Sequence, residues 1–143
     1  MDHYNLERFK RAQEYDYESA LREILSGRKT GHWMWYVFPQ MRGLGQSDMS
    51  DYFGIGSLDE AKAYLADPVL GARLAGISGA LLGQEERDPM KIFGYPDGLK
   101  LRSCMTLFSE AGGESSVYRQ VLDAFYHGEK DARTMALLER GQA

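Results

Sequence analysis

Helix start signals recur along this chain, and they constrain its fold more than any other feature. Asp67-Pro68 and Asp88-Pro89 each place a carboxylate directly before a proline. The carboxylate can cap a helix as the N-cap residue, and proline is well tolerated at the first helical position because the N–H it lacks would have no partner there. Both dipeptides therefore predict the start of a helix, and apolar residues at helical spacing extend the first of these over residues 69–82.

Capping and apolar spacing predict most of the remaining chain to be helical as well. Ser57 and Glu60 form a capping-box pattern, in which each side chain accepts a backbone N–H at a helix start, and this helix is expected to run to about Leu65. Asn5 is the predicted cap of the first helix, and Gly27 stands where a left-handed C-cap residue is expected. Further helices are predicted over residues 6–15, 17–25, 97–111, 117–127 and 131–140.

The run 33–38 is the one segment whose type stays open. It is short, aromatic and closed by Pro39, so its pattern fits either a helical turn or a minor strand. A chain of 143 residues with no Pro- or Ser-rich linker fits one domain. We therefore predict a mainly α, single compact multihelical domain of about six to eight helices over residues 1–143.

Composition excludes several functional classes. The net charge of -4 gives no electrostatic footprint for general nucleic-acid binding. A single cysteine, Cys104, rules out an internal disulfide, and the three histidines lie too far apart in sequence for a metal-ligand motif. No apolar run reaches the roughly 18 residues that a membrane span requires. We expect a cytoplasmic protein with no membrane association, no metal and no cofactor.

The segment 31–56 has the composition of a binding pocket. It combines both tryptophans and other aromatic side chains with five glycines and several polar residues. Candidate ligand-binding residues are Trp33, Trp35, Gln40, Arg42, Gly43, Gly45, Ser47, Tyr52 and, from a later helix, Arg102. The candidate catalytic residues are His32, because imidazole titrates near neutral pH, and Glu60, which follows the segment directly.

Each of these candidates also has a purely structural interpretation. At least one tryptophan is expected in the core, and His32 fits a packing or capping role beside the preceding turn. The Gly43-Leu-Gly45 loop is expected more often as an ordinary tight turn than as a phosphate site, because no Walker motif follows. Glu60 is fully explained by its capping box. The sequence alone leaves these alternatives open.

Three phrases of the chain carry a family resemblance. HWMWYVFPQMRGLGQS, SDYFGIGSLDEAKAYLADPVLGARL and IFGYPDGLKLRSCMTLF together resemble the bacterial family catalogued as domain of unknown function 1810, sometimes labelled calpastatin-like. The resemblance implies a small multihelical domain. The aromatic segment followed by the helix with Glu60 and Tyr64 is also similar to the NADAR superfamily, whose members act on ADP-ribose linkages. The glutamate-histidine pair that is frequent in the NADAR superfamily is absent from this chain at that place, because alanine, Ala61, follows Glu60.

Two functional hypotheses follow. The NADAR likeness implies a protein that binds or hydrolyses a nucleotide-like ligand such as an ADP-ribose N-glycoside. In that case Trp33 or Trp35 would stack a ring, Arg42 would meet the pyrophosphate, and Glu60 would orient water. The alternative is a non-enzymatic helical module whose aromatic segment docks a protein partner. The sequence does not indicate an oligomeric state.

Overall fold

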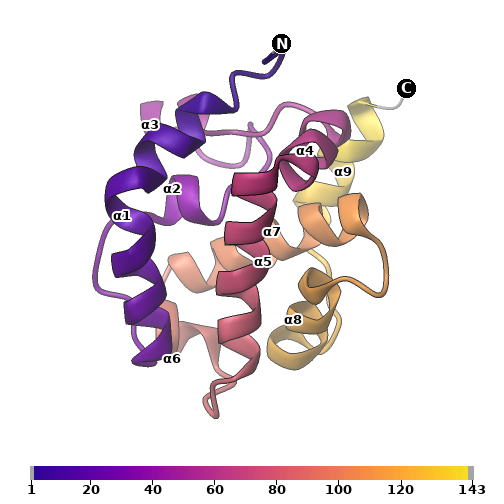
Figure 1. Ribbon diagram of the computed structural model, residues 1–143. Helices are drawn as coiled ribbons and strands as arrows, with labels where there is room; N and C mark the ends of the chain where they lie inside the picture. The colour runs from indigo at the N-terminus through magenta and orange to yellow at the C-terminus, as the bar shows by residue number, and fades with distance from the viewer. Residues whose placement is uncertain (1, 142–143) are drawn as a thin grey trace.

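The computed structural model describes residues 2–141, and within this range the chain folds into nine helices (Figure 1). They are α1 (Glu7–Leu25), α2 (Met34–Val37), α3 (Asp48–Tyr52), α4 (Leu58–Ala66), α5 (Pro68–Leu82), α6 (Pro89–Phe93), α7 (Asp97–Gly112), α8 (Val117–Tyr126) and α9 (Ala132–Gly141). The mainly helical prediction is confirmed. The number of helices exceeds the expected six to eight because α3 was not predicted and α2 lies in the run 33–38, whose type the sequence left open.

The predicted Asp-Pro helix starts form as expected. Asp67 Oδ1 accepts the backbone N–H groups of Val69 and Leu70 at 2.9 and 3.0 Å, so it caps α5. Asp88 Oδ1 accepts the N–H of Met90 at 2.9 Å at the start of α6. These bonds satisfy donors that have no partner inside the helix. Capping residues therefore fix where these two helices begin.

The first two predicted helices are a single helix, α1. The predicted break between residues 15 and 17 is wrong, because the buried stripe of Phe9, Gln13, Ala20 and Ile24 continues through it. Gln13 belongs to this stripe since its side-chain amide donates to buried acceptors, the Tyr36 carbonyl and the Tyr64 hydroxyl. The buried face of α1 thus includes a polar residue, so a search for apolar residues alone would break this face at Gln13.

The start of α1 also differs from the prediction. Asn5 adopts a left-handed conformation, with φ of 53°, and does not cap the helix. Asp2 takes this role, and its carboxylate accepts the backbone N–H groups of Leu6 and Glu7 at 2.7 and 3.0 Å. At the other end, Gly27 has the predicted positive φ, here 85°.

The aromatic run 33–38 forms a helical turn, α2, and residues 2–141 contain no strand. The minor strand is therefore not formed. Backbone pairing occurs instead at one isolated parallel bridge between Met41 and Ile55. There the Arg42 N–H donates to Ile55 O and the Ile55 N–H donates to Gln40 O, both at 2.8 Å. This bridge closes the loop that contains α3.

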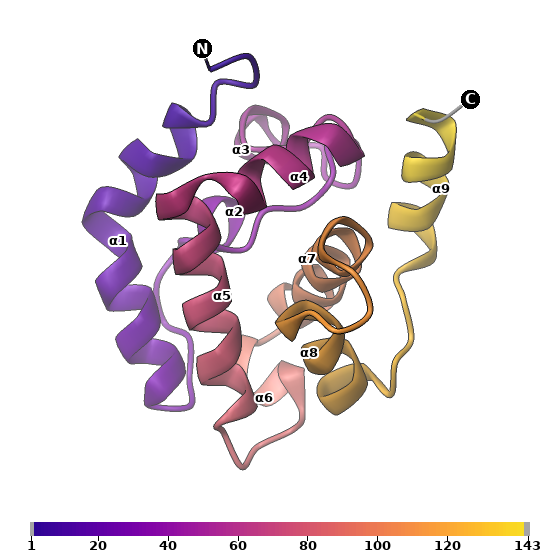
Figure 2. The same ribbon diagram turned by 45° about the vertical axis from the view of Figure 1, so that its right-hand side comes forward.

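Helix α7 is the centre of the fold. Its residues from Ser103 to Ser109 are all buried, and it packs against α4, α6, α8 and α9 (Figures 1 and 2). Helices α1 and α5 lie side by side on the opposite flank from α9 (Figure 2). A row of aromatic rings in edge-to-face or tilted contact crosses the core from α1 to α8, with centroids 5.2 to 5.8 Å apart, through Phe9, Tyr64, Phe108 and Tyr118.

The length and apolar composition of the helices decide whether one of them could cross a membrane. Among residues 2–141, no single helix is both long and apolar enough to cross a bilayer. Helices α4 and α5 reach that length and composition only together, across a bend of 92°. The cytoplasmic location remains a prediction.

Candidate functional site

A half-open pocket of about 430 Å³ lies between the loop that follows α2, the first half of α7 and the start of α9. The apolar side chains that line it are Trp35, Met41, Leu44, Phe53, Pro96 and Leu99. Its polar and charged lining residues are Gln40, Gln46, Ser47, Ser50, Lys100, Arg102, Ser103, Asp131 and Arg133. The pocket thus joins three parts of the chain that are far apart in sequence.

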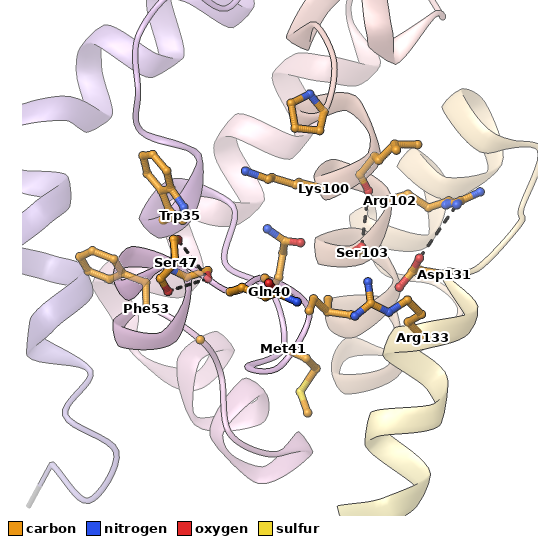
Figure 3. Close-up of a pocket in the computed structure, with 17 residues that line it drawn as sticks. Trp35, Gln40, Met41, Ser47, Phe53, Lys100, Arg102, Ser103, Asp131 and Arg133 are labelled. Atoms are coloured by element: carbon orange, nitrogen blue, oxygen red, sulfur yellow. Dashed lines mark hydrogen bonds and ion pairs between the residues drawn. The ribbon is translucent and has the colours of Figure 1, made fainter.

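The aromatic half of the pocket is formed by Trp35 and Phe53. Trp35 is partly exposed, whereas Phe53 is buried and packs against Tyr36 with the two rings tilted and their centroids 5.1 Å apart. Lys100 extends from α7 toward Trp35 (Figure 3), and its Nζ lies 5.4 Å from the centre of the Trp35 ring. This half offers a flat surface with a cation beside it.

The charged half contains Arg102, Arg133 and Asp131. Figure 3 shows Arg102 and Asp131 facing each other, with Arg133 next to them. The Nη atoms of Arg102 reach carboxylate oxygens of Glu129 and Asp131 only at 3.9 Å, and its buried Nε has no hydrogen-bond partner among residues 2–141. A buried donor without a partner is unfavourable by about 1–3 kcal/mol. Arg102 is therefore incompletely satisfied.

Asp131 is held in place by its own helix start. Its Oδ2 accepts the backbone N–H and the hydroxyl of Thr134 at 2.9 and 2.6 Å, and its N–H donates to Thr106 Oγ1 at 2.9 Å. The N-cap role orients the side chain and leaves Oδ1 on the side of Arg102. The pocket therefore has a fixed carboxylate that faces the guanidinium group of Arg102.

Comparison with known proteins assigns the chain to a protein family. The family model described as "Protein of unknown function (DUF1810)" matches residues 3–138. The chain belongs to this family. It is also similar to the conserved hypothetical protein Rv1873 from Mycobacterium tuberculosis, whose crystal structure was determined at 1.38 Å. The identity is 46 %, 95 % of this chain and 97 % of the other are covered, and the TM-score is 0.92. No curated protein matches the chain significantly.

The DUF1810 membership confirms the family resemblance of the three sequence phrases. These comparisons carry neither the calpastatin label nor the similarity to the NADAR superfamily, which remains a prediction.

Five of the sequence-predicted ligand residues line the pocket of this DUF1810 protein: Trp35, Gln40, Gly45, Ser47 and Arg102. Ser47 also caps α3, because its Oγ accepts the Ser50 N–H at 3.1 Å. A Cβ on Gly45 would lie 2.6 Å from the Ser50 hydroxyl, so the close turn requires glycine. Five residues that the sequence singled out thus lie together in one pocket lining, and their role in binding a ligand remains a prediction.

The other predicted ligand residues lie outside the pocket lining. Trp33 is in the core at 2 % exposure, and Tyr52 is 55 % exposed on the surface. Arg42 donates from Nε to the Asp51 carbonyl at 3.1 Å and from Nη2 to the Gly54 carbonyl at 3.0 Å. Gly43, with φ of 103°, provides a positive-φ position in the loop. Arg42 and Gly43 thus contribute to the loop's backbone structure.

The two predicted catalytic residues are also outside the lining. His32 is exposed in the loop before α2. Glu60 is buried, and its Oε2 accepts Arg8 Nη2 at 2.8 Å while its Oε1 accepts the Gly56 N–H at 3.0 Å. Ser57 Oγ accepts the Glu60 N–H, so half of the predicted capping box forms. The Glu60 carboxylate reaches Gly56, before the N-cap, because Arg8 draws it toward α1.

Arg8 holds the loop that forms one wall of the pocket. Its guanidinium donates to the carbonyl groups of Tyr52 and Gly54 at 2.8 and 3.0 Å, in addition to Glu60. Gly54 belongs to the pocket lining, and so does Phe53 between these two carbonyls. The Arg8–Glu60 ion pair therefore positions the backbone that presents Phe53.

Several pocket residues were not identified from sequence. Lys100 was not among the candidate residues, and Asp131 and Arg133 lie at least 75 residues after the end of the segment 31–56. The local signal was the pair of cations, Lys100 and Arg102, which alternate with leucines at the start of α7. Cys104 in the same helix is buried, and burial raises its pKa well above the usual value, as expected for an inert thiol.

Glu23 fixes the loop before Trp33, and this predicts a pH effect. Burial favours its neutral form, but hydrogen bonds from the Gly31 and Thr30 N–H groups and from Trp33 Nε1 outweigh burial and lower the pKa of Glu23. A lowered pKa in the folded state means that the stabilisation is present above the unfolded-state pKa and is lost as pH falls through the folded-state pKa.

We expect wild-type protein to lose more stability between about pH 5 and pH 3 than Glu23→Gln does. Urea unfolding at several pH values measures this difference. Glu18→Gln, an exposed residue of the same helix, is the control and should follow the wild-type curve. Parallel curves for wild type and Glu23→Gln would contradict the assignment.

Proposed function

We propose that this DUF1810 protein binds a compact, nucleotide-like anion in the pocket. The planar ring lies against Trp35 and Phe53, and the phosphate lies at the end formed by Arg102 and Arg133. The observation that carries the proposal is the guanidinium group of Arg102, with a buried, unpartnered Nε and only 3.9 Å contacts to carboxylates. A phosphate would supply the acceptors that this group lacks.

The arginines near the pocket differ in how far their donors are occupied. Arg8 and Arg42 donate to backbone carbonyls at 2.6 to 3.1 Å, so they have little capacity for a ligand. Arg102 and Arg133 belong to the lining residues, and Arg133 is exposed. An anion is therefore expected at Arg102 and Arg133, and not at Arg42, where the resemblance had placed the pyrophosphate.

Charge and size narrow the ligand class. The lining residues include three cations, Lys100, Arg102 and Arg133, against one carboxylate, Asp131. The lining itself thus has an excess of two positive charges, which Asp97 beside Lys100 and Glu129 beside Arg102 offset in part. A phosphate monoester carries about -1.5 to -2. The volume of about 430 Å³ lies in the lower part of the range for ligand pockets, roughly 300–1,000 Å³. Both quantities favour a single base, sugar and phosphate unit.

The proposal is limited to binding. Cleavage of an ADP-ribose N-glycoside, which the NADAR likeness implies, requires a carboxylate at the reacting bond. Asp131 is the carboxylate of the pocket lining, whereas Glu60 is in a buried ion pair with Arg8. Any such cleavage would therefore depend on Asp131 before Glu60.

Titration with nucleotides tests the proposal. Adenosine monophosphate is the probe, with ADP-ribose and NAD as larger comparisons. We expect Arg133→Ala to weaken binding of the monophosphate about tenfold, because it removes a charge-assisted hydrogen bond. Arg140→Ala is the matched control, because Arg140 is an exposed arginine of the same helix, α9, and lies outside the lining, so this variant should bind like wild type.

Two outcomes would contradict the proposal. Equal weakening by both substitutions would mean that the anion does not lie at the Arg102 and Arg133 end. The absence of any thermal shift with millimolar nucleotides would exclude binding, because a ligand at 100 times its Kd stabilises by about 2.7 kcal/mol. The interaction-module hypothesis would then be favoured, supported by the exposed Tyr95 and Leu99 beside the pocket residue Pro96.

A further inference from the structure

Both tryptophans carry a lysine over the ring, and the two lysines share one carboxylate. Lys29 Nζ lies 5.0 Å from the centre of Trp33, and Lys100 Nζ lies 5.4 Å from the centre of Trp35. Asp97, at the start of α7, pairs with Lys29 at 2.8 Å through Oδ2 and with Lys100 at 3.5 Å through Oδ1. The core tryptophan and the pocket tryptophan are thus linked through a single acidic residue.

The two lysines are not equally bound to Asp97. The Lys29 side chain is only 7 % exposed and also donates to the Gly31 carbonyl, so loss of Asp97 would leave a buried charge unpaired. The Lys100 side chain is 32 % exposed and its contact with Asp97 is longer. Partly exposed ion pairs of this kind contribute about 0–1 kcal/mol. Asp97 therefore pairs mainly with Lys29, and the ammonium group of Lys100 can move away from Asp97 and Trp35.

We propose that Lys100 is the specificity-determining residue of the pocket: it covers Trp35 in the free protein and moves to the ligand's anionic group when the ring enters. This inference rests on the proposed function. The Trp35 face that Lys100 covers is the surface on which a planar ring would stack, so the ammonium group has to leave it. A ligand with an anionic group near its ring compensates for this loss, and a neutral ligand does not.

The first test needs no ligand. Trp33 is buried, so fluorescence quenching by neutral acrylamide reports chiefly on Trp35, and Trp35→Phe supplies the background. Lys100→Ala should raise the quenching constant on the order of twofold, because a long lysine side chain shields the apolar surface that it covers. Lys91→Ala, an exposed lysine of α6 outside this pocket, is the control and should leave quenching unchanged.

The second test separates the charge of Lys100 from its bulk. Lys100→Met keeps a long side chain but removes the ammonium group. We expect this variant to bind adenosine monophosphate about tenfold more weakly than wild type, the effect of one charge-assisted hydrogen bond. Its affinity for neutral adenosine should not fall and should rise by up to about fivefold, because the variant has no ammonium group over Trp35 for the ring to displace.

Each outcome decides the question. Unchanged quenching in Lys100→Ala would show that Lys100 does not cover Trp35. Equal weakening of adenosine and its monophosphate by Lys100→Met would show that Lys100 does not recognise the anion, although the proposed binding function would stand. If wild type binds neither compound, the proposed function fails and the role of Lys100 in ligand recognition fails with it.

Discussion

Replacement of Arg8 by methionine should lower the free energy of unfolding by about 3–5 kcal/mol, the cost of breaking a buried ion pair from one side. Arg8 and Glu60 are only 4 % and 6 % exposed and lie 2.8 Å apart. The substitution leaves the Glu60 carboxylate buried with the Gly56 N–H as its remaining partner. It also removes the Arg8 donor of the Tyr52 carbonyl and one of the two donors of the Gly54 carbonyl, which keeps its hydrogen bond from Arg42.

Chemical denaturation measures this effect. The control is Arg11→Met, because Arg11 is 80 % exposed and its oxygen partner on Glu7 is 3.9 Å away, and it should change stability by less than about 0.5 kcal/mol. The double variant Arg8→Met with Glu60→Met should regain part of the loss, since no unpaired charge remains. An Arg8→Met protein as stable as Arg11→Met would show that the ion pair does not hold the loop.

Two glycines of α5 should respond to alanine in opposite directions. A Cβ on Gly71 would lie 2.2 Å from the Leu65 carbonyl oxygen, a backbone atom that the close corner between α4 and α5 keeps in place. We expect Gly71→Ala to destabilise the protein by about 3 kcal/mol, the upper end for overpacked sites. Gly79 is exposed and has no atom within 4 Å of an added Cβ, so Gly79→Ala should stabilise by about 0.5–1 kcal/mol.

Thermal and urea unfolding of the two variants provide the comparison. Because both substitutions add one methyl group to the same helix, the difference between them isolates the contact with Leu65 from helix propensity. A stabilised Gly71→Ala protein would mean that the corner between α4 and α5 opens easily. That result would also show that the close contact between Leu65 and position 71 does not require glycine.

Local signals predicted most of the fold. Asp67, Asp88 and Ser57 cap helices by bonds to backbone groups two or three residues away, so the sequence contains the whole interaction. The failures have long-range causes. Gln13 continues the buried face of α1 because it reaches Tyr36 and Tyr64, which no window of α1 includes.

Most of the pocket residues that the sequence singled out lie close together in the chain. The loop residues Trp35, Gln40, Gly45 and Ser47 lie within one segment, and its composition pointed to a pocket. Asp131 and Arg133 meet them only through the packing of α9 near α7, which the sequence does not encode in any neighbouring pattern. For the same reason the sequence could not show which arginine side chains already donate hydrogen bonds to other parts of the protein. Arg42 looked available beside the glycines, yet backbone carbonyls already take its donors.

A crystal structure of the protein with adenosine monophosphate would test the central claim most directly. We predict that the phosphate lies within hydrogen-bond distance of Arg102 and Arg133, that the ring stacks on Trp35, and that Lys100 Nζ has left that ring. Density for the nucleotide at Arg42 or in another part of the surface, with the pocket unchanged, would contradict the account.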